Sequence, residues 1–178
     1  EIIADASVQS FYMKRILPFI FICFAQTLFA THNRAGEITY RYISGFTYEV
    51  TITTYTRGSV QADRCELTLF WGDGTSSILP RVNGLLGTCQ GGARMGVNIG
   101  GDVQKNIYTG RHTYATAGLY DLSFEDPNRN AGINNIPQSV SVPFFLKSQL
   151  VVDAGLKGNS SPLLLNPPID DGCLNRRF

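Results

Sequence analysis

The sequence has little of the chemistry that metal centres, polyanion-binding proteins and common enzymes use. Two histidines and four cysteines occur in 178 residues, without a C-x-x-C pair or a His/Cys cluster, so a zinc site is not indicated. Fifteen basic and fourteen acidic side chains leave a net charge of +1, which argues against a nucleic-acid partner. G-x-S-x-G, H-E-x-x-H and a phosphate-binding glycine loop with its lysine are also missing. These absences predict a protein that is not an enzyme and has no cofactor.

The one long apolar run lies near the N-terminus, in residues 13–30 (MKRILPFIFICFAQTLFA). A basic pair, an apolar stretch and a small residue, Ala30, follow Met13 in the order typical of a secretory signal peptide, and the run is too short for a membrane span. Leu28 is larger than usual for its position, which leaves the cleavage site open. Residues 1–12 are interpreted as translation upstream of the true start. We expect a secreted chain, without a membrane span, that begins near residue 31.

The cysteines that follow this run are odd in number: Cys65, Cys89 and Cys173. In an oxidising compartment an odd count indicates a free thiol or a partner outside the sequence. We predict a Cys65–Cys89 disulfide, which would tie a strand to the glycine-rich loop after it. Cys173 is expected to pair beyond this sequence.

The remaining pattern has a period of two. Ile38, Tyr40 and Tyr42 alternate with polar residues, and the same alternation occurs in residues 46–53, 65–71 and 118–125. Pro143 indicates an edge or a bulge in the last extended run. No amphipathic helix is indicated. About seven short strands predict an all-β fold, an Ig-like antiparallel β-sandwich over residues 31–153, with residues 154–178 as a linker and the start of a truncated next module.

The segment WGDGTS, residues 71–76, joins two of these strands. Asp-Gly between strands is turn chemistry, in which the Asp73 carboxylate accepts backbone N–H groups and glycine adopts positive φ. Trp71 has the phase of Leu67 and Leu69, so we expect it in the core. Asp73 is therefore predicted to organise a turn. A glycosidase pair of Asp73 with Glu125 is not favoured, because neither has a visible reason for a raised pKa.

Two motifs carry a family resemblance. Trp71-Gly72-Asp73-Gly74-Thr75 and residues 112–120 (HTYATAGLY) resemble the PKD-domain patterns W-x-F-G-D-G and H-x-Y-x-x-P-G-x-Y, although Ala117 replaces the usual proline and the first motif is shorter. THNRAGEITYRYI, EDPNRNAGINNIPQSVSVPF and NSSPLLLNPPIDDGC also resemble the N-terminal module of large secreted Bacteroidota surface proteins. Those are known as gliding-motility-associated or type IX-sorted proteins.

This resemblance implies a PKD-type sandwich at the cell surface, acting as a non-enzymatic structural or adhesive module. Its implied partners are other domains of the same polypeptide, surface glycans or surface proteins. It also implies that His112 starts a strand and bonds loop backbone. The motif residues expected to support the fold are Trp71, Gly72, Asp73, Gly74, His112, Tyr114, Gly118 and Tyr120.

A calcium site is an open alternative in the segment EDPNRNAG. Asp126, Asn128 and Asn130 place oxygen ligands at alternate positions, as a hard cation prefers, but the spacing departs from an EF-hand loop. The competing interpretation is an Asx-rich turn whose side chains cap their own backbone.

Two further alternatives concern binding and oxidation. A carbohydrate-binding module would use outward tyrosines to stack on sugar rings, although about half of them have core phase. The candidates are Tyr40, Tyr42, Tyr48, Tyr55, Tyr108 and Tyr114. Cleavage after Thr31 would make His32 the first residue and allow a copper-binding histidine brace with His112. Cleavage after Ala30, which the small-residue preference favours, excludes that brace.

Overall fold

The computed structural model describes residues 33–59, 64–84, 96–127, 129–155 and 158–166. The predicted signal peptide, His32, Cys89, Asn128 and Cys173 lie outside the described residues. The sequence-based statements about them therefore stay predictions. Among the described residues, no helix is long and apolar enough to cross a membrane.

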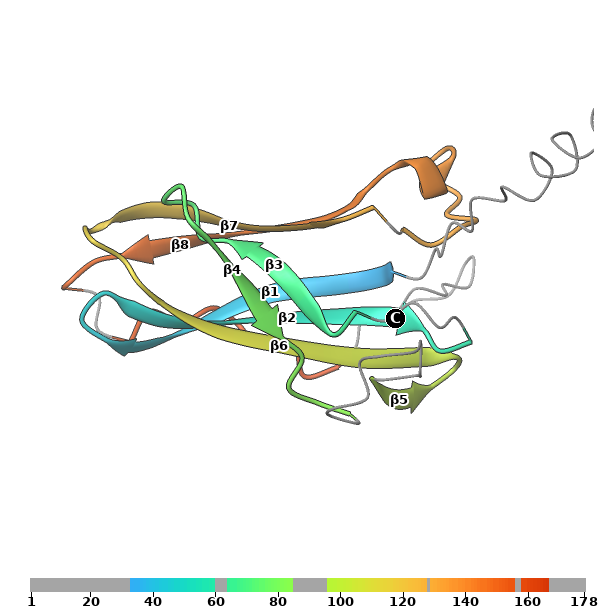
Figure 1. The fold of residues 1–178 in the computed structure, drawn as a ribbon, viewed down its shortest axis with the longest axis horizontal. Coiled ribbons are helices and arrows are strands. Elements are labelled where there is room, and N and C mark those ends of the chain that lie inside the picture. Colours follow the sequence, from blue (N-terminus) through green and yellow to red (C-terminus); the bar gives the residue numbers. More distant parts are fainter. Residues whose placement is uncertain (1–32, 60–63, 85–95, 128, 156–157, 167–178) are drawn as a thin grey trace, which may run out of the picture.

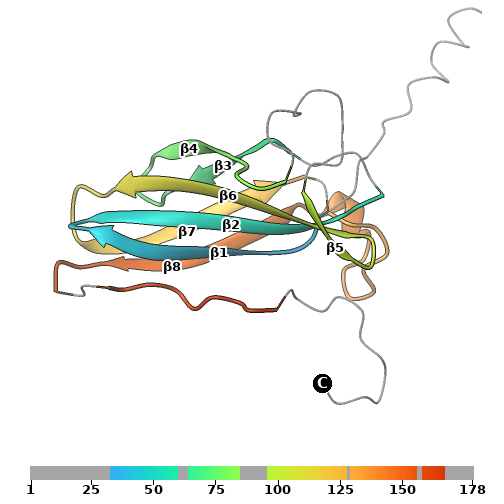
Figure 2. The same cartoon turned by 90° about the horizontal axis from the view of Figure 1, so that it is seen from below.

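Two antiparallel four-stranded sheets face each other (Figures 1 and 2). Sheet A has the order β1-β2-β6-β5, and sheet B has the order β4-β3-β7-β8. The strands of sheet A are β1 (Asn33–Ser44), β2 (Thr47–Arg57), β5 (Val97–Gly100) and β6 (Val103–Thr113). Those of sheet B are β3 (Glu66–Phe70), β4 (Ser76–Pro80), β7 (Gly118–Asp126) and β8 (Phe144–Val152). The fold is the predicted all-β, Ig-like sandwich.

The period-two pattern separates core from surface side chains in most of the predicted strands, but residues 52–56 of β2 are all buried, including Thr53, which the alternation places outward. Tyr48, Val50 and Ile52 of β2 point inward and are fully buried, as are Leu69 and Trp71. The other core residues are Ile38, Leu67, Leu79, Tyr108, Tyr114, Leu122, Phe124, Phe144, Leu150 and Val152. A tight turn that contains Gly45, at a φ of 53°, joins β1 to β2.

Two boundaries differ from the sequence analysis. The final extended run begins with a short 3-10 helix, η1 (Ser139–Ser141), so the strand starts only after Pro143. Because proline has no N–H, it fits before the first residue of β8, and β8 lies at the edge of sheet B as predicted. β1 starts earlier than expected, at Asn33, because the polar Asn33 is itself buried and pairs with Thr56.

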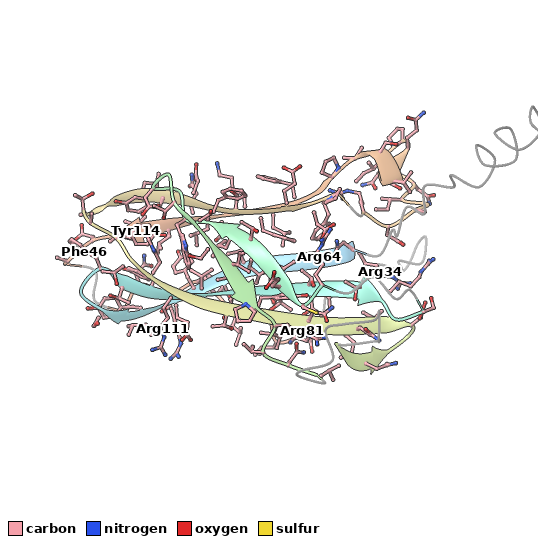
Figure 3. All side chains as sticks on the ribbon, in the orientation of Figure 1. Arg34, Phe46, Arg64, Arg81, Arg111 and Tyr114 are labelled. Atoms are coloured by element: carbon pink, nitrogen blue, oxygen red, sulfur yellow. The ribbon has the colours of Figure 1, made fainter. Side chains whose placement is uncertain are left out.

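The sandwich has two chemically different ends, and Figure 3 labels residues of each. The aromatic end holds Trp71, His112, Tyr114 and Tyr120, where β3 turns into β4 and β6 into β7. The polar end holds buried polar side chains of β1, β2, β6 and β7, together with Arg64. These buried side chains are Asn33, Thr54, Thr56, Gln104, Asn106 and Asp126.

Residues 158–166, here called the strap, lie against the edge of β1 (Figure 2). Ser161 N donates to Tyr40 O at 2.9 Å, and Tyr40 N donates to Ser161 Oγ at 2.8 Å. Asn159 Nδ2 donates to Val151 O at 2.8 Å, so the strap contacts edge strands of both sheets. This segment belongs to the predicted linker, residues 154–178. Proline and serine indicate an extended chain, but only the fold shows that an open strand edge lies beside it.

Candidate functional site

The WGDGTS turn is built around the Asp73 carboxylate. Asp73 Oδ1 accepts hydrogen bonds from Thr75 N at 2.9 Å and from Thr75 Oγ1 at 2.6 Å, which confirms the predicted turn. Gly72 has a φ of 83°, and a Cβ there would lie 2.6 Å from Asp121 N. Glycine at position 72 is thus required both by backbone conformation and by the close approach of β7.

His112 joins this turn to the opposite sheet. Its Nε2 lies 2.7 Å from Asp73 Oδ2, and its ring stacks on Trp71 with centroids 4.7 Å apart and planes 14° apart. The expectation that His112 starts a strand and bonds loop backbone is wrong. His112 lies near the end of β6, where the register Tyr48↔His112 brings its ring to the Asp73 turn.

Tyr114 and Tyr120 extend the cluster. Tyr114 Oη donates to Trp71 O at 3.0 Å, and its ring stacks on Tyr120 at 4.1 Å. Tyr120 Oη donates to Thr116 O at 3.0 Å, closing the turn between β6 and β7. A Cβ at Gly118 would lie 3.4 Å from the Tyr120 ring, an ordinary contact, so nothing in the structure explains a need for glycine there.

Electrostatics keep Asp73 ionised. Its partial burial opposes ionisation, but hydrogen bonds from Thr75 and His112 outweigh that effect and lower the pKa of Asp73 to about 2. Burial, with the nearby Asp73 charge, raises the pKa of Tyr114, so its hydroxyl stays a donor. Trp71 Nε1 donates to Ser77 Oγ at 2.9 Å. The Asp73–His112 and Tyr114–Trp71 bonds thus link the two sheets, whereas the Trp71–Ser77 bond lies within sheet B.

Of the three calcium candidates, the structure describes Asp126 and Asn130, whereas Asn128 lies outside the described residues. Asp126 is buried and ion-paired with Arg64, whose guanidinium reaches both carboxylate oxygens, with Nη2 at 3.4 Å from Oδ1. Asn130 N donates to Asn33 O at 2.9 Å. No group of three or more His, Cys, Asp or Glu side chains comes together within the described ranges. A calcium ion at Asp126 would compete with Arg64; a calcium-induced rise in melting temperature, lost in Asp126→Ala, remains its test.

The remaining candidates divide between core and surface. Tyr48, Tyr55, Tyr108 and Tyr114 are buried, so they offer no sugar-stacking platform. Tyr40 and Tyr42 are partly buried against the core. Of the aromatic side chains in the described ranges, Phe70 and Phe145 stand out on the outer face of sheet B, 50% and 51% exposed.

Cysteine and copper predictions rest on residues that the structure only partly describes. Cys65 is disulfide-bonded. Its predicted partner, Cys89, lies outside the described residues. His32 lies outside them too, and Nε2 of His112 is engaged by Asp73.

Sequence reasoning missed a charged row across the outer face of sheet A. Glu49 of β2 lies between Arg41 of β1 and Arg111 of β6 and pairs with both. Period-two phase places all three side chains outward. Only the strand order and register place the three side chains next to one another. The sequence therefore indicates that they face outward but not that they are neighbours.

No family model, curated protein or solved structure matches the chain. The fold alone defines its class, an Ig-like antiparallel β-sandwich.

Proposed function

We propose that this sandwich is a PKD-like, non-enzymatic module of a secreted multidomain cell-surface protein, serving as a spacer or adhesive unit. The observation that carries the proposal is the Asp73–His112 bond beneath the stacked Trp71 ring. Asp73 and His112, the motif side chains best suited to acid–base chemistry, instead bond each other and join the two sheets. Function then falls to the outer faces, which suits a module that touches other surfaces.

The hydrogen bonds of Trp71, Asp73, His112 and Tyr114 support this assignment. Asp73 accepts a hydrogen bond from Thr75 N and contacts Nε2 of His112. The Trp71 carbonyl accepts a hydrogen bond from Tyr114. A general base would need a substrate proton within reach, whereas Asp73 has a lowered pKa and bonded oxygens. Asp73 thus acts as a fold determinant.

An attachment assay tests the proposal. Beads carrying the chain from residue 31 onward are tested for retention on cell-surface preparations under flow, and the soluble protein is assayed with chromogenic glycosides and esters. We expect retention without turnover, and retention per folded molecule unchanged in Asp73→Asn. Turnover that disappears in Asp73→Asn or His112→Asn would contradict the proposal, and the absence of any attachment would exclude the adhesive role in favour of the spacer.

A second candidate function, carbohydrate binding, is favoured by the exposed rings of Phe70 and Phe145 on the outer face of sheet B. Flat aromatic rings stack on the apolar faces of sugars. Affinity gels of neutral polysaccharides should retain the wild type and release Phe70→Ala and Phe145→Ala. Ile78→Ala is the matched control, because Ile78 is also exposed on that face, at 63%, but carries no ring. Equal loss in Ile78→Ala would indicate general hydrophobic adhesion.

A further inference from the structure

The outer face of sheet A carries an arrangement of charges that the motif cluster does not explain. Arg41, Glu49 and Arg111 lie opposite one another on three adjacent strands. Arg41 Nη2 is 2.7 Å from Glu49 Oε1, and Arg111 Nε is 2.8 Å from Glu49 Oε2. Each carboxylate oxygen therefore holds one arginine, and Figure 3 shows Arg111 directed away from the sandwich.

This row has an excess positive charge that faces solvent. Glu49 is mostly buried between the arginines, and their hydrogen bonds, first from Arg41 and then from Arg111, lower the pKa of its carboxyl. The arginine side chains are 63% and 62% exposed, so N–H groups not directed at Glu49 remain accessible. Two cations and one anion leave a local charge of +1. Because Glu49 already orders both guanidinium groups, an incoming acid group would cost less side-chain entropy.

A cavity of about 230 Å³ adjoins the row. Sheet A supplies one wall, with Thr39, Thr51, Arg41 and Glu49, and the strap supplies the other, from Ser160 to Leu163. A water molecule occupies about 30 Å³ of the liquid, so the space exceeds what a few bridging waters would need. Thr51 Oγ1 lies 3.5 Å from Thr109 Oγ1, which continues a line of hydroxyl groups across the sheet toward β6.

We propose that this arginine groove, formed by Arg41, Thr39, Thr51 and the strap with Arg111 beside it across Glu49, binds an acidic polysaccharide through its carboxylate or sulfate groups. The exposed guanidinium edges match planar or tetrahedral oxyanions, which they bond bidentately. The threonine and serine hydroxyls that line the groove are suited to sugar hydroxyls. This assignment rests on the proposed adhesive function and names the surface and the ligand class for it.

The strap has a second role besides covering the edge of β1, because it forms one side of the groove. Tyr42 N donates to Ser160 Oγ at 3.3 Å, and Ser161 bonds Tyr40 through its backbone and side chain. These bonds hold Pro162 and Leu163 over the outer face as the second wall of the cavity. Without the strap, the row would be a flat charged surface.

The test is a titration of the chain from residue 31 onward with three soluble polymers: a polyuronate, dextran sulfate and uncharged dextran. We expect binding to one or both acidic polymers and none to dextran; comparing the acidic polymers tells carboxylate from sulfate recognition. Arg41→Gln and Arg111→Gln should each weaken binding roughly tenfold, the scale of a lost charge-assisted hydrogen bond. Arg111→Lys should recover only part of the lost affinity, because the lysine charge does not restore the bidentate hydrogen bonding of a guanidinium group.

Lys147→Gln is the matched control, since it removes one half-exposed, ion-paired cation from sheet B. Its affinity should stay within twofold of the wild type, and melting temperatures confirm that each variant is folded. An equal loss of affinity in Lys147→Gln would overturn the proposed groove, because it would show that binding depends on the overall charge of the protein. No binding to either acidic polymer would also overturn it, as would tighter binding of poly-glutamate through the same arginines. Attachment that persists on cell surfaces in Arg41→Gln/Arg111→Gln would leave the adhesive function standing while excluding the groove.

Discussion

The two ends of the sandwich are stabilised in different ways. At the aromatic end, stacked rings surround one Asp–His contact, and Asp73 has both carboxylate oxygens bonded. At the polar end, the buried Asp126 relies on Arg64, and within the described part of the chain Asn106 Oδ1 and Gln104 Oε1 have no hydrogen-bond donor. The comparison teaches that two short motifs can together specify one end of a fold. The other end is assembled from residues scattered along the chain.

The largest effect should follow from removing the ring at the centre of the aromatic end. Trp71→Ala should lower the free energy of unfolding by about 4 kcal/mol, because it empties a fully buried position beneath His112. Urea unfolding measures this, with Phe70→Ala as control, since Phe70 is the half-exposed neighbour on the other face. Similar losses of stability in the two variants would show that Trp71 contributes no more to the fold than an exposed ring does.

A smaller effect is expected at the polar end. Arg64→Met should cost about 2 kcal/mol, because it leaves the Asp126 carboxylate buried with less compensation. Arg111→Met removes an arginine from an exposed ion pair and should cost less than about 1 kcal/mol. If Arg64→Met unfolds at the wild-type urea concentration, the ion pair does not hold this end together.

Acid should weaken the aromatic end through Asp73. Its folded-state pKa of about 2 lies below the ordinary 3.8, so its contribution is complete above about pH 4 and is lost as the pH falls toward 2. After allowance for its 21% exposed side chain, we expect about 1–2 kcal/mol. Unfolding curves from pH 5 to pH 2 should fall more steeply for the wild type than for Asp73→Asn. Parallel curves would be inconsistent with this origin.

The smallest effect concerns the strap. Ser161→Ala removes the hydroxyl that accepts Tyr40 N but keeps the backbone bond to Tyr40 O, so about 1 kcal/mol is expected. Hydrogen exchange should quicken at Tyr40 without a change at Trp71. Ser76→Ala, at an exposed position of β4, serves as the control. Unchanged exchange at Tyr40 would mean that the strap does not protect the β1 edge.

Much of the fold could be predicted because its causes are local. Alternation in β2, β3 and β7 identified the core faces, and Asp-Gly chemistry identified the Asp73 turn. Inside-facing polar residues such as Asn106 escaped detection, because alternation counts apolar side chains only. η1 was missed because its three residues carry no periodic signal.

The site was predictable only in part, since its contacts are long-range. Asp73 and His112 are 39 positions apart, and family resemblance alone linked the two motifs. The resemblance did not reveal that His112 bonds the Asp73 carboxylate. The Arg41–Glu49–Arg111 row and the strap depend on strand order and register, which no single segment encodes.

A double-mutant cycle on Asp73 and His112, measured by urea unfolding at pH 7, tests the central claim most directly. If the pair joins the two sheets, Asp73→Ala and His112→Ala should each destabilise the protein, and the double variant should lose at least about 1 kcal/mol less than the sum. Strictly additive losses, or an Asp73→Ala variant that keeps full stability while losing attachment, would contradict the account and make Asp73 part of a binding site.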